Sequence, residues 1–146
     1  MDNLKQELAN LSWNMPDSIQ QEAIERLVSI DDEDMPQLLQ PISKFCWENA
    51  AKVIRKIGYP RINPITSGLL EWIADMNWPG AWIIMEILEE GEPKNLVKSI
   101  EEAIIKAYGD EDDMWMTSLK NLVTRLGLVE DDFNNSKVFG YLDEIE

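Results

Sequence analysis

The stretch LLEWIADMNWPGA, residues 69–81, decides the fold class of this chain. Leu69 and Ile73 stand four positions apart, the spacing that places side chains on one face of a helix, and this pattern breaks near Met76. Pro79 follows, and proline is favoured in the first turn of a helix because its missing N–H is not needed there. The stretch therefore predicts the end of one helix, a turn, and the start of another.

Apolar residues three and four positions apart recur along almost all of the chain, and no convincing run alternates apolar with polar residues. Prolines and aspartates mark helix starts, and Gly58, Gly91, Gly109 and Gly127 mark helix ends. We therefore predict an all-α protein. The expected helices cover residues 3–9, 17–30, 36–42, 43–57, 63–76, 79–90, 93–108 and 113–126, and a short one follows at 138–142.

Three segments of the helical pattern can be laid over one another. Each begins with a tryptophan (Trp47, Trp78 or Trp115), carries aliphatic residues at helical spacing, and ends at a glycine. The tryptophans are 31 and 37 positions apart, the length of a two-helix repeat, and such helix pairs stack on one another to bury their apolar faces. An irregular helical bundle is the alternative. The predicted organisation is one domain over residues 1–146, with a repeat core at about 36–127 and an acidic tail at 128–146.

LLEWIADMNWPGA resembles the turn of a HEAT-type helical repeat, and together with WENAAKVIRKIGYP at 47–60 it resembles a family of small bacterial proteins classed as a domain of unknown function. The resemblance covers roughly residues 38–127, and DMNWPG is its most specific part. Pro79, Gly80 and Ala81 replace the arginine that HEAT repeats carry early in the second helix. The resemblance implies stacked antiparallel helix pairs in a short right-handed HEAT-like superhelix, and it implies no catalytic residues.

The charge of the chain narrows the possible functions. Its 146 residues hold 13 lysines and arginines against 28 aspartates and glutamates, a net charge of −15, and no histidine. Without histidine there is no Ser/His/Asp or Cys/His catalytic pair and no imidazole-ligated zinc. A charge of this sign also repels nucleic-acid phosphates and anionic membrane surfaces. Most enzyme classes are thereby disfavoured.

The sequence indicates a cytoplasmic protein. The longest stretch without a charged residue, Met76–Met85, has ten residues, whereas a membrane span needs about 20 apolar ones. The first residues, MDNLKQEL, carry acids where an export signal carries a basic start. Cys46 is the only cysteine, so it forms no disulfide within the chain, and its neighbours Phe45 and Trp47 favour burial in the core.

Acidic runs stand at four predicted helix boundaries, and none has the DxDxDG spacing of a calcium loop. Acids at helix starts stabilise a helix by about 0.3–1 kcal/mol each through its dipole. Glu86 shares a helix face with Glu89 or Glu90, but exposed neighbours lack the unequal environments that acid–base catalysis needs. We therefore expect no metal, no cofactor and no catalytic residue. The acidic runs are residues 31–34, 89–92, 110–113 and 130–132.

The basic residues are concentrated in one segment, the basic island of residues 44–61. Its local charge is +4, which leaves −19 for the rest of the chain. Lys52, Arg55 and Lys56 share one helix face within it. These cations either complement the negative end of the helix dipole or form a contact patch for an acidic partner.

Six tryptophans are many for a chain of this length, and most are expected in the core. We expect Trp72 and Trp82 to reach the surface, because leucines and isoleucines nearby already supply a core face. An exposed tryptophan beside charged residues is typical of a protein-binding hot spot. The predicted partner-binding residues are Lys52, Arg55, Lys56, Trp72, Trp82 and Glu86.

These features favour a non-enzymatic module that binds another protein. Its most concrete form is a bacterial immunity or antidote protein, because an acidic inhibitor associates rapidly with a basic toxin. Two alternatives stay open. A nucleic-acid-associated helical-repeat protein would use the basic island, and a carboxylate-dependent hydrolase would need acids that face a common pocket.

Overall fold

The computed structural model describes residues 3–145, and over these residues the protein is all-helical, as predicted. Short 3₁₀ helices stand between or after some of its α-helices. The α-helices are α1 (Leu4–Ala9), α2 (Asp17–Leu27), α3 (Lys44–Ile57), α4 (Thr66–Trp72), α5 (Ala81–Glu89), α6 (Pro93–Gly109), α7 (Asp113–Arg125) and α8 (Ser136–Tyr141). The 3₁₀ helices are η1 (Asp32–Leu38), η2 (Asn63–Ile65), η3 (Glu130–Asp132) and η4 (Leu142–Glu144).

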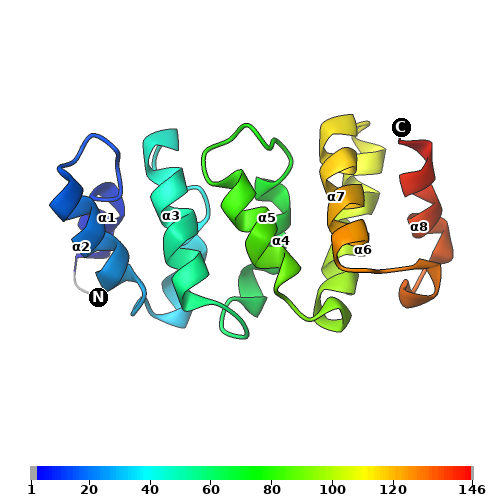
Figure 1. Ribbon diagram of the computed structural model, residues 1–146, viewed down its shortest axis with the longest axis horizontal. Helices are drawn as coiled ribbons and strands as arrows, with labels where there is room; N and C mark the ends of the chain where they lie inside the picture. The colour runs from blue at the N-terminus through cyan, green and yellow to red at the C-terminus, as the bar shows by residue number, and fades with distance from the viewer. Residues whose placement is uncertain (1–2, 146) are drawn as a thin grey trace.

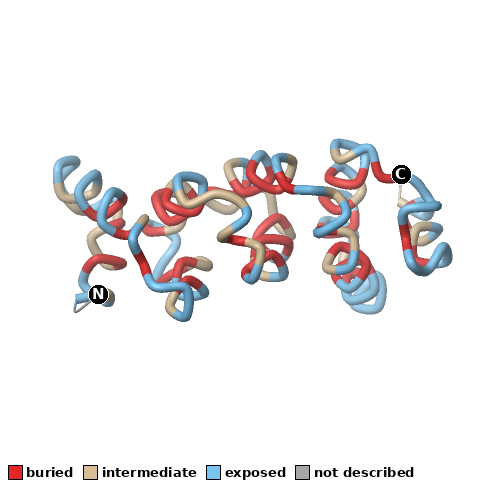
Figure 2. Tube along the Cα trace, turned by 90° about the horizontal axis from the view of Figure 1, so that it is seen from below, coloured by how far each residue is buried: buried red, intermediate tan, exposed pale blue. Residues whose placement is uncertain are grey.

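The helices stand side by side along the long axis of an elongated molecule, with the two ends of the chain at opposite ends of it (Figure 1). Contacts divide the later helices into two rows. In the first row α3 packs against α5 and α5 against α7, and in the second row α4 packs against α6 and α6 against α8. Buried segments face each other between the rows, and exposed segments lie outside (Figure 2).

Helices of the first row run parallel to one another. Gly80, just before α5, lies against Ala51 in α3, and Glu86 further along α5 pairs with Arg55 further along α3. Because the residues meet in the same order along both helices, α3 and α5 point the same way. The partners Arg55 and Glu86 are 31 positions apart, the same separation as Trp47 and Trp78.

The apolar residues that recur at helical spacing form one core between the rows. Leucine and isoleucine dominate it, and burying one such side chain contributes about 1.5–3 kcal/mol. Cys46 is buried, as predicted. A polar side chain joins the N-terminal part of the chain to this core: the amide nitrogen of Asn49 donates to the Leu11 carbonyl and to Gln20 Oε1, each at 2.8 Å.

Local start and stop signals set most helix boundaries. Gly58 and Gly127 follow α3 and α7 with φ of 69° and 70°, as the prediction of helix-ending glycines requires. The carboxylate of Asp112 accepts a hydrogen bond from the Trp115 N–H at 3.1 Å and so caps α7. Gly109 is the last residue of α6, so this helix also ends where it was predicted to end.

Two predicted helix starts were wrong. The helix expected to begin at Pro36 is η1, which begins at Asp32 and contains the proline, because the preceding acidic run already forms the first 3₁₀ turn. The helix expected to begin at Pro79 begins at Ala81, because Gly80 adopts a φ of 84°, outside the helical region. Ile42, expected on an apolar helix face, is exposed with a φ of 56°.

Candidate partner-binding surface

Helices α3 and α5 carry most of the predicted binding residues. Trp82, the second residue of α5, is 55% exposed, as predicted. Glu86 lies one helical turn further along α5 and is also exposed. A tryptophan of this exposure on a well-packed helix leaves much apolar surface in water, which marks the place as a candidate contact site.

Arg55 and Glu86 are brought together by the packing of α3 against α5. Their side chains form an ion pair with an N–O distance of 3.4 Å, and both remain largely exposed. Lys56 is exposed and Lys52 half-buried on the same helix. Within residues 3–145 neither lysine has an ion-pair partner, so both are available to another molecule.

Arg125, near the end of α7, belongs to this surface although the sequence analysis did not single it out. Its guanidinium group lies 6.0 Å from the centre of the Trp82 ring, and it pairs with Glu89 of α5. Cations within about 6 Å of a tryptophan ring are attracted to it. The sequence separation of its partner resembles a tryptophan spacing: Glu89 and Arg125 are 36 positions apart, and Trp78 and Trp115 are 37 apart.

Two hollows flank the Trp82 side chain. The first, here the Met114 hollow, has a volume of about 270 Å³ between α5 and α7, and Met76 and the 56%-exposed Met114 line it with Trp82. The second, here the Glu48 hollow, has a volume of about 360 Å³ between α5 and α3, and Glu48 and Trp78 line it with Trp82. Trp82 is therefore a ridge between two depressions.

The prediction that Trp72 reaches the surface was wrong. Its side chain is fully buried, and its indole N–H donates to the Pro79 carbonyl at 3.0 Å. The centre of its ring is 6.4 Å from that of Trp47 in an edge-on contact. Trp72 is buried because the turn after α4 folds back over the end of that helix and covers the ring.

Besides Arg55, two cations of the basic island have partners inside the molecule. Arg61 donates to Asp32 Oδ1 at 2.8 Å, to the Val28 carbonyl at 2.9 Å, and to the Ile30 carbonyl. It fastens the segment after α2 to the segment after α3. The ammonium group of Lys44 lies 6.0 Å from the centre of the Trp47 ring.

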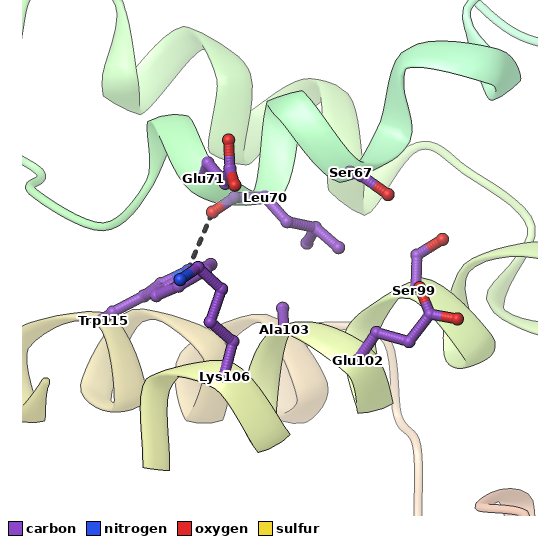
Figure 3. A pocket seen from close by; sticks show the side chains of 8 residues that line it. All are labelled: Ser67, Leu70, Glu71, Ser99, Glu102, Ala103, Lys106 and Trp115. Carbon is purple, nitrogen blue, oxygen red and sulfur yellow. Dashed lines mark hydrogen bonds between the residues drawn. The ribbon is translucent and has the colours of Figure 1, made fainter. Parts of the chain in front are cut away.

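A smaller hollow lies between α4 and α6 in the second row (Figure 3). Its floor is apolar, and the indole N–H of Trp115 donates to the Leu70 carbonyl there at 2.9 Å. The volume is about 140 Å³, below the roughly 300 Å³ of small-molecule sites. Polar residues point in from both helices, and those at its rim are Ser67, Glu71, Ser99, Glu102 and Lys106.

One group of acids in the described chain places three carboxylates close together. Oxygens of Asp31, Glu33 and Asp34 lie within 4.8 Å of one another at the start of η1. Calcium takes six to eight oxygen ligands, so these side chains alone leave a calcium shell incomplete. Such acids also stabilise the start of a helix, the role predicted for this run.

Fold and surface together define an all-helical protein of two packed rows, with an exposed tryptophan ridge and two interhelical ion pairs on its first row. A family model described as Domain of unknown function (DUF5071) matches residues 39–134, and the chain belongs to that family. The match contains both stretches on which the resemblance to such a family rested. No curated protein and no solved structure matches the chain. Within residues 3–145, no helix combines the length and the apolar character of a membrane span.

Proposed function

We propose that this protein is a non-enzymatic module that binds another protein on the outer surface of α3, α5 and α7. The observation that carries the proposal is Trp82, which stands 55% exposed between two hollows. Tryptophan and arginine are the residues most enriched in binding hot spots. In this proposal the two rows form a short right-handed HEAT-like superhelix, whose outer surface presents the contact residues.

The ion pairs beside Trp82 support the same proposal. Arg55 pairs with Glu86 on one side of the ridge, and Arg125 pairs with Glu89 on the other. Exposed pairs of this kind contribute about 0–1 kcal/mol to stability, so little is lost when a partner rearranges them. They surround the apolar ridge with polar groups, which is the arrangement of a protein interface.

The net charge of −15 favours a basic partner. Complementary charge speeds the encounter of two proteins and makes it sensitive to salt. The concrete form of the proposal is a cytoplasmic bacterial immunity or antidote protein that occupies a functional site of a basic partner.

The test uses the purified chain as bait in a lysate of its own source cells, at low and high salt. A stoichiometric protein partner is expected, with recovery that falls as salt rises and is lost with Trp82→Ala. Trp13→Ala is the matched control, because Trp13 is also exposed but contacts Phe45 near the N-terminal end of the molecule. Equal recovery with wild type and Trp82→Ala would contradict the proposed surface.

The immunity form of the proposal has its own test. The captured partner is expressed in bacteria with and without this chain, and growth is measured. The wild-type chain is expected to relieve growth arrest, and Trp82→Ala is expected not to. If the captured partner has no effect on growth, the protein can still be a binding module, but the immunity role is excluded.

A further inference from the structure

The two hollows beside Trp82 differ in chemistry. The Met114 hollow is walled mainly by apolar groups, including Ala74 and Met76. The Glu48 hollow combines a carboxylate with the rings of Trp78 and Trp82. The volume of the Met114 hollow, about 270 Å³, is below the lower limit of small-molecule sites, about 300 Å³, and that of the Glu48 hollow, about 360 Å³, is just above it. Hollows of this size suit single side chains of a larger ligand.

We propose that the hollows bind an extended segment of the partner that crosses the Trp82 ridge. An apolar side chain of this segment fills the Met114 hollow, and a lysine or arginine three residues away reaches the Glu48 hollow. This inference rests on the proposed function and specifies the kind of partner.

The usual spacing of packed helices suggests the separation of three residues. They lie on opposite sides of α5, and neighbouring helix axes in proteins are about 8–10 Å apart. A polyproline II segment rises about 3.1 Å per residue with three residues per turn. Side chains three residues apart therefore point the same way and are separated by about 9 Å. In a β-strand, side chains three residues apart point to opposite faces and cannot enter both hollows.

The rings around the Glu48 hollow favour the same conformation. Trp78 and Trp82 line it together with Pro79, and the Trp78 ring is fixed edge-on against Trp47 with centroids 5.9 Å apart. Grooves lined by aromatic side chains are the usual docking sites of polyproline II segments. Such a segment is already extended before binding, so it loses less conformational entropy.

Glu48 gives the site its preference for a cation. Glu86 and Glu89 on the same surface are paired with arginines, whereas Glu48 has no ion-pair partner in the part of the chain described. The ammonium group of Lys44, one turn earlier, is placed over the Trp47 ring instead. A lysine or arginine of the partner would pair with Glu48 and pack its methylene groups on Trp82.

The test uses three blocked, fluorescently labelled peptides and the full chain. In PPLPPRPP, leucine and arginine are three residues apart; PPLRPPPP has the same composition with the two adjacent; PPLPPEPP replaces arginine with glutamate. Fluorescence anisotropy is expected to show binding of PPLPPRPP and about tenfold weaker binding of the other two, the factor set by about 1.4 kcal/mol. If none binds, or if PPLRPPPP binds equally well, the inference is overturned.

Protein variants separate this inference from the proposed function. Glu48→Gln is expected to weaken PPLPPRPP by about tenfold and not to weaken PPLPPEPP, because it removes one negative charge and keeps the size of the side chain. Circular dichroism checks that the variant is folded. If Trp82→Ala abolishes partner capture while no peptide distinguishes wild type from Glu48→Gln, the proposed function stands and this inference falls. If sedimentation instead detects a dimer that Trp82→Ala dissociates, a second copy occupies the hollows and this inference falls as well.

Discussion

The indole N–H of Trp72 donates to the Pro79 carbonyl at 3.0 Å, which closes the turn between α4 and α5 over a fully buried ring. The same turn is held by Asp75, whose carboxylate accepts the Asn77 N–H at 2.9 Å. The segment DMNWPG therefore forms a hydrogen-bonded turn that positions α5 against α3. Trp72, which donates to this segment, is part of the core, whereas the ridge residue Trp82 lies two positions after the segment ends.

Gly80→Ala is expected to destabilise the protein by about 1–3 kcal/mol, the cost of a residue held in an unfavourable backbone region. Gly80 has a φ of 84°, and a Cβ atom there would lie 3.0 Å from both the Ala51 Cβ and the Trp47 carbonyl oxygen. Urea unfolding followed by circular dichroism measures the change.

Gly109→Ala is the control for that substitution. Gly109 lies at the end of α6, and an added Cβ meets no atom within 4 Å. Alanine is favoured over glycine in a helix by about 0.5–1 kcal/mol, so this variant is expected to be as stable as wild type or slightly more stable. Equal losses of stability for Gly80→Ala and Gly109→Ala would contradict the proposal that close packing at Gly80 holds the turn.

Trp115→Phe is expected to cost about 1–3 kcal/mol, because it removes the donor to the buried Leu70 carbonyl at 2.9 Å. That hydrogen bond joins α7 to α4 and so connects the two rows. Trp82→Phe is the comparison. The Trp82 ring is exposed, so replacing it is expected to lower the free energy of unfolding much less. Thermal unfolding of both variants checks the difference, and a larger loss for Trp82→Phe would refute it.

Local signals allowed most of the fold to be predicted, because they depend on only a few neighbouring residues. The glycine after α3, Gly58, and the capping aspartate of α7, Asp112, are of this kind. The start of α5 was misplaced because Pro79 and Gly80 both signal a boundary, and only the packing against α3 decides between them.

The binding surface was less predictable, because it depends on contacts between helices. Trp72 and Trp82 have similar sequence surroundings, yet one is covered by the returning turn and the other stands free. Arg125 and Met114 join the surface only through the register of α7 against α5. The spacing of the tryptophans is close to the separation of the residues that meet between α5 and α7. Spacing alone, however, does not specify which side chains stay exposed.

Arg61→Lys is expected to destabilise the protein more than Arg55→Lys. Arg61 reaches a carboxylate and two backbone carbonyls at once, and lysine lacks the planar fork that makes such contacts together. Leaving carbonyls of this kind without donors costs about 1–3 kcal/mol. The exposed pair of Arg55 with Glu86 is worth about 0–1 kcal/mol. Urea unfolding at neutral pH ranks the two variants, and the reverse order would show that Arg61 does not anchor the segment after α2.

Tyr59 is expected to ionise at a higher pH than an ordinary tyrosine. Burial raises the pKa of Tyr59 to about 12, and its ring lies close against Gly91. The unfolded chain releases this proton near pH 10, whereas the folded chain keeps it, so stability falls as pH rises from 10 to about 12. Tyr59→Phe is expected to remove this part of the pH dependence, together with a step near pH 12 in the ultraviolet titration of tyrosinate. A variant that instead loses a step near pH 10 would show that the Tyr59 hydroxyl is in contact with water.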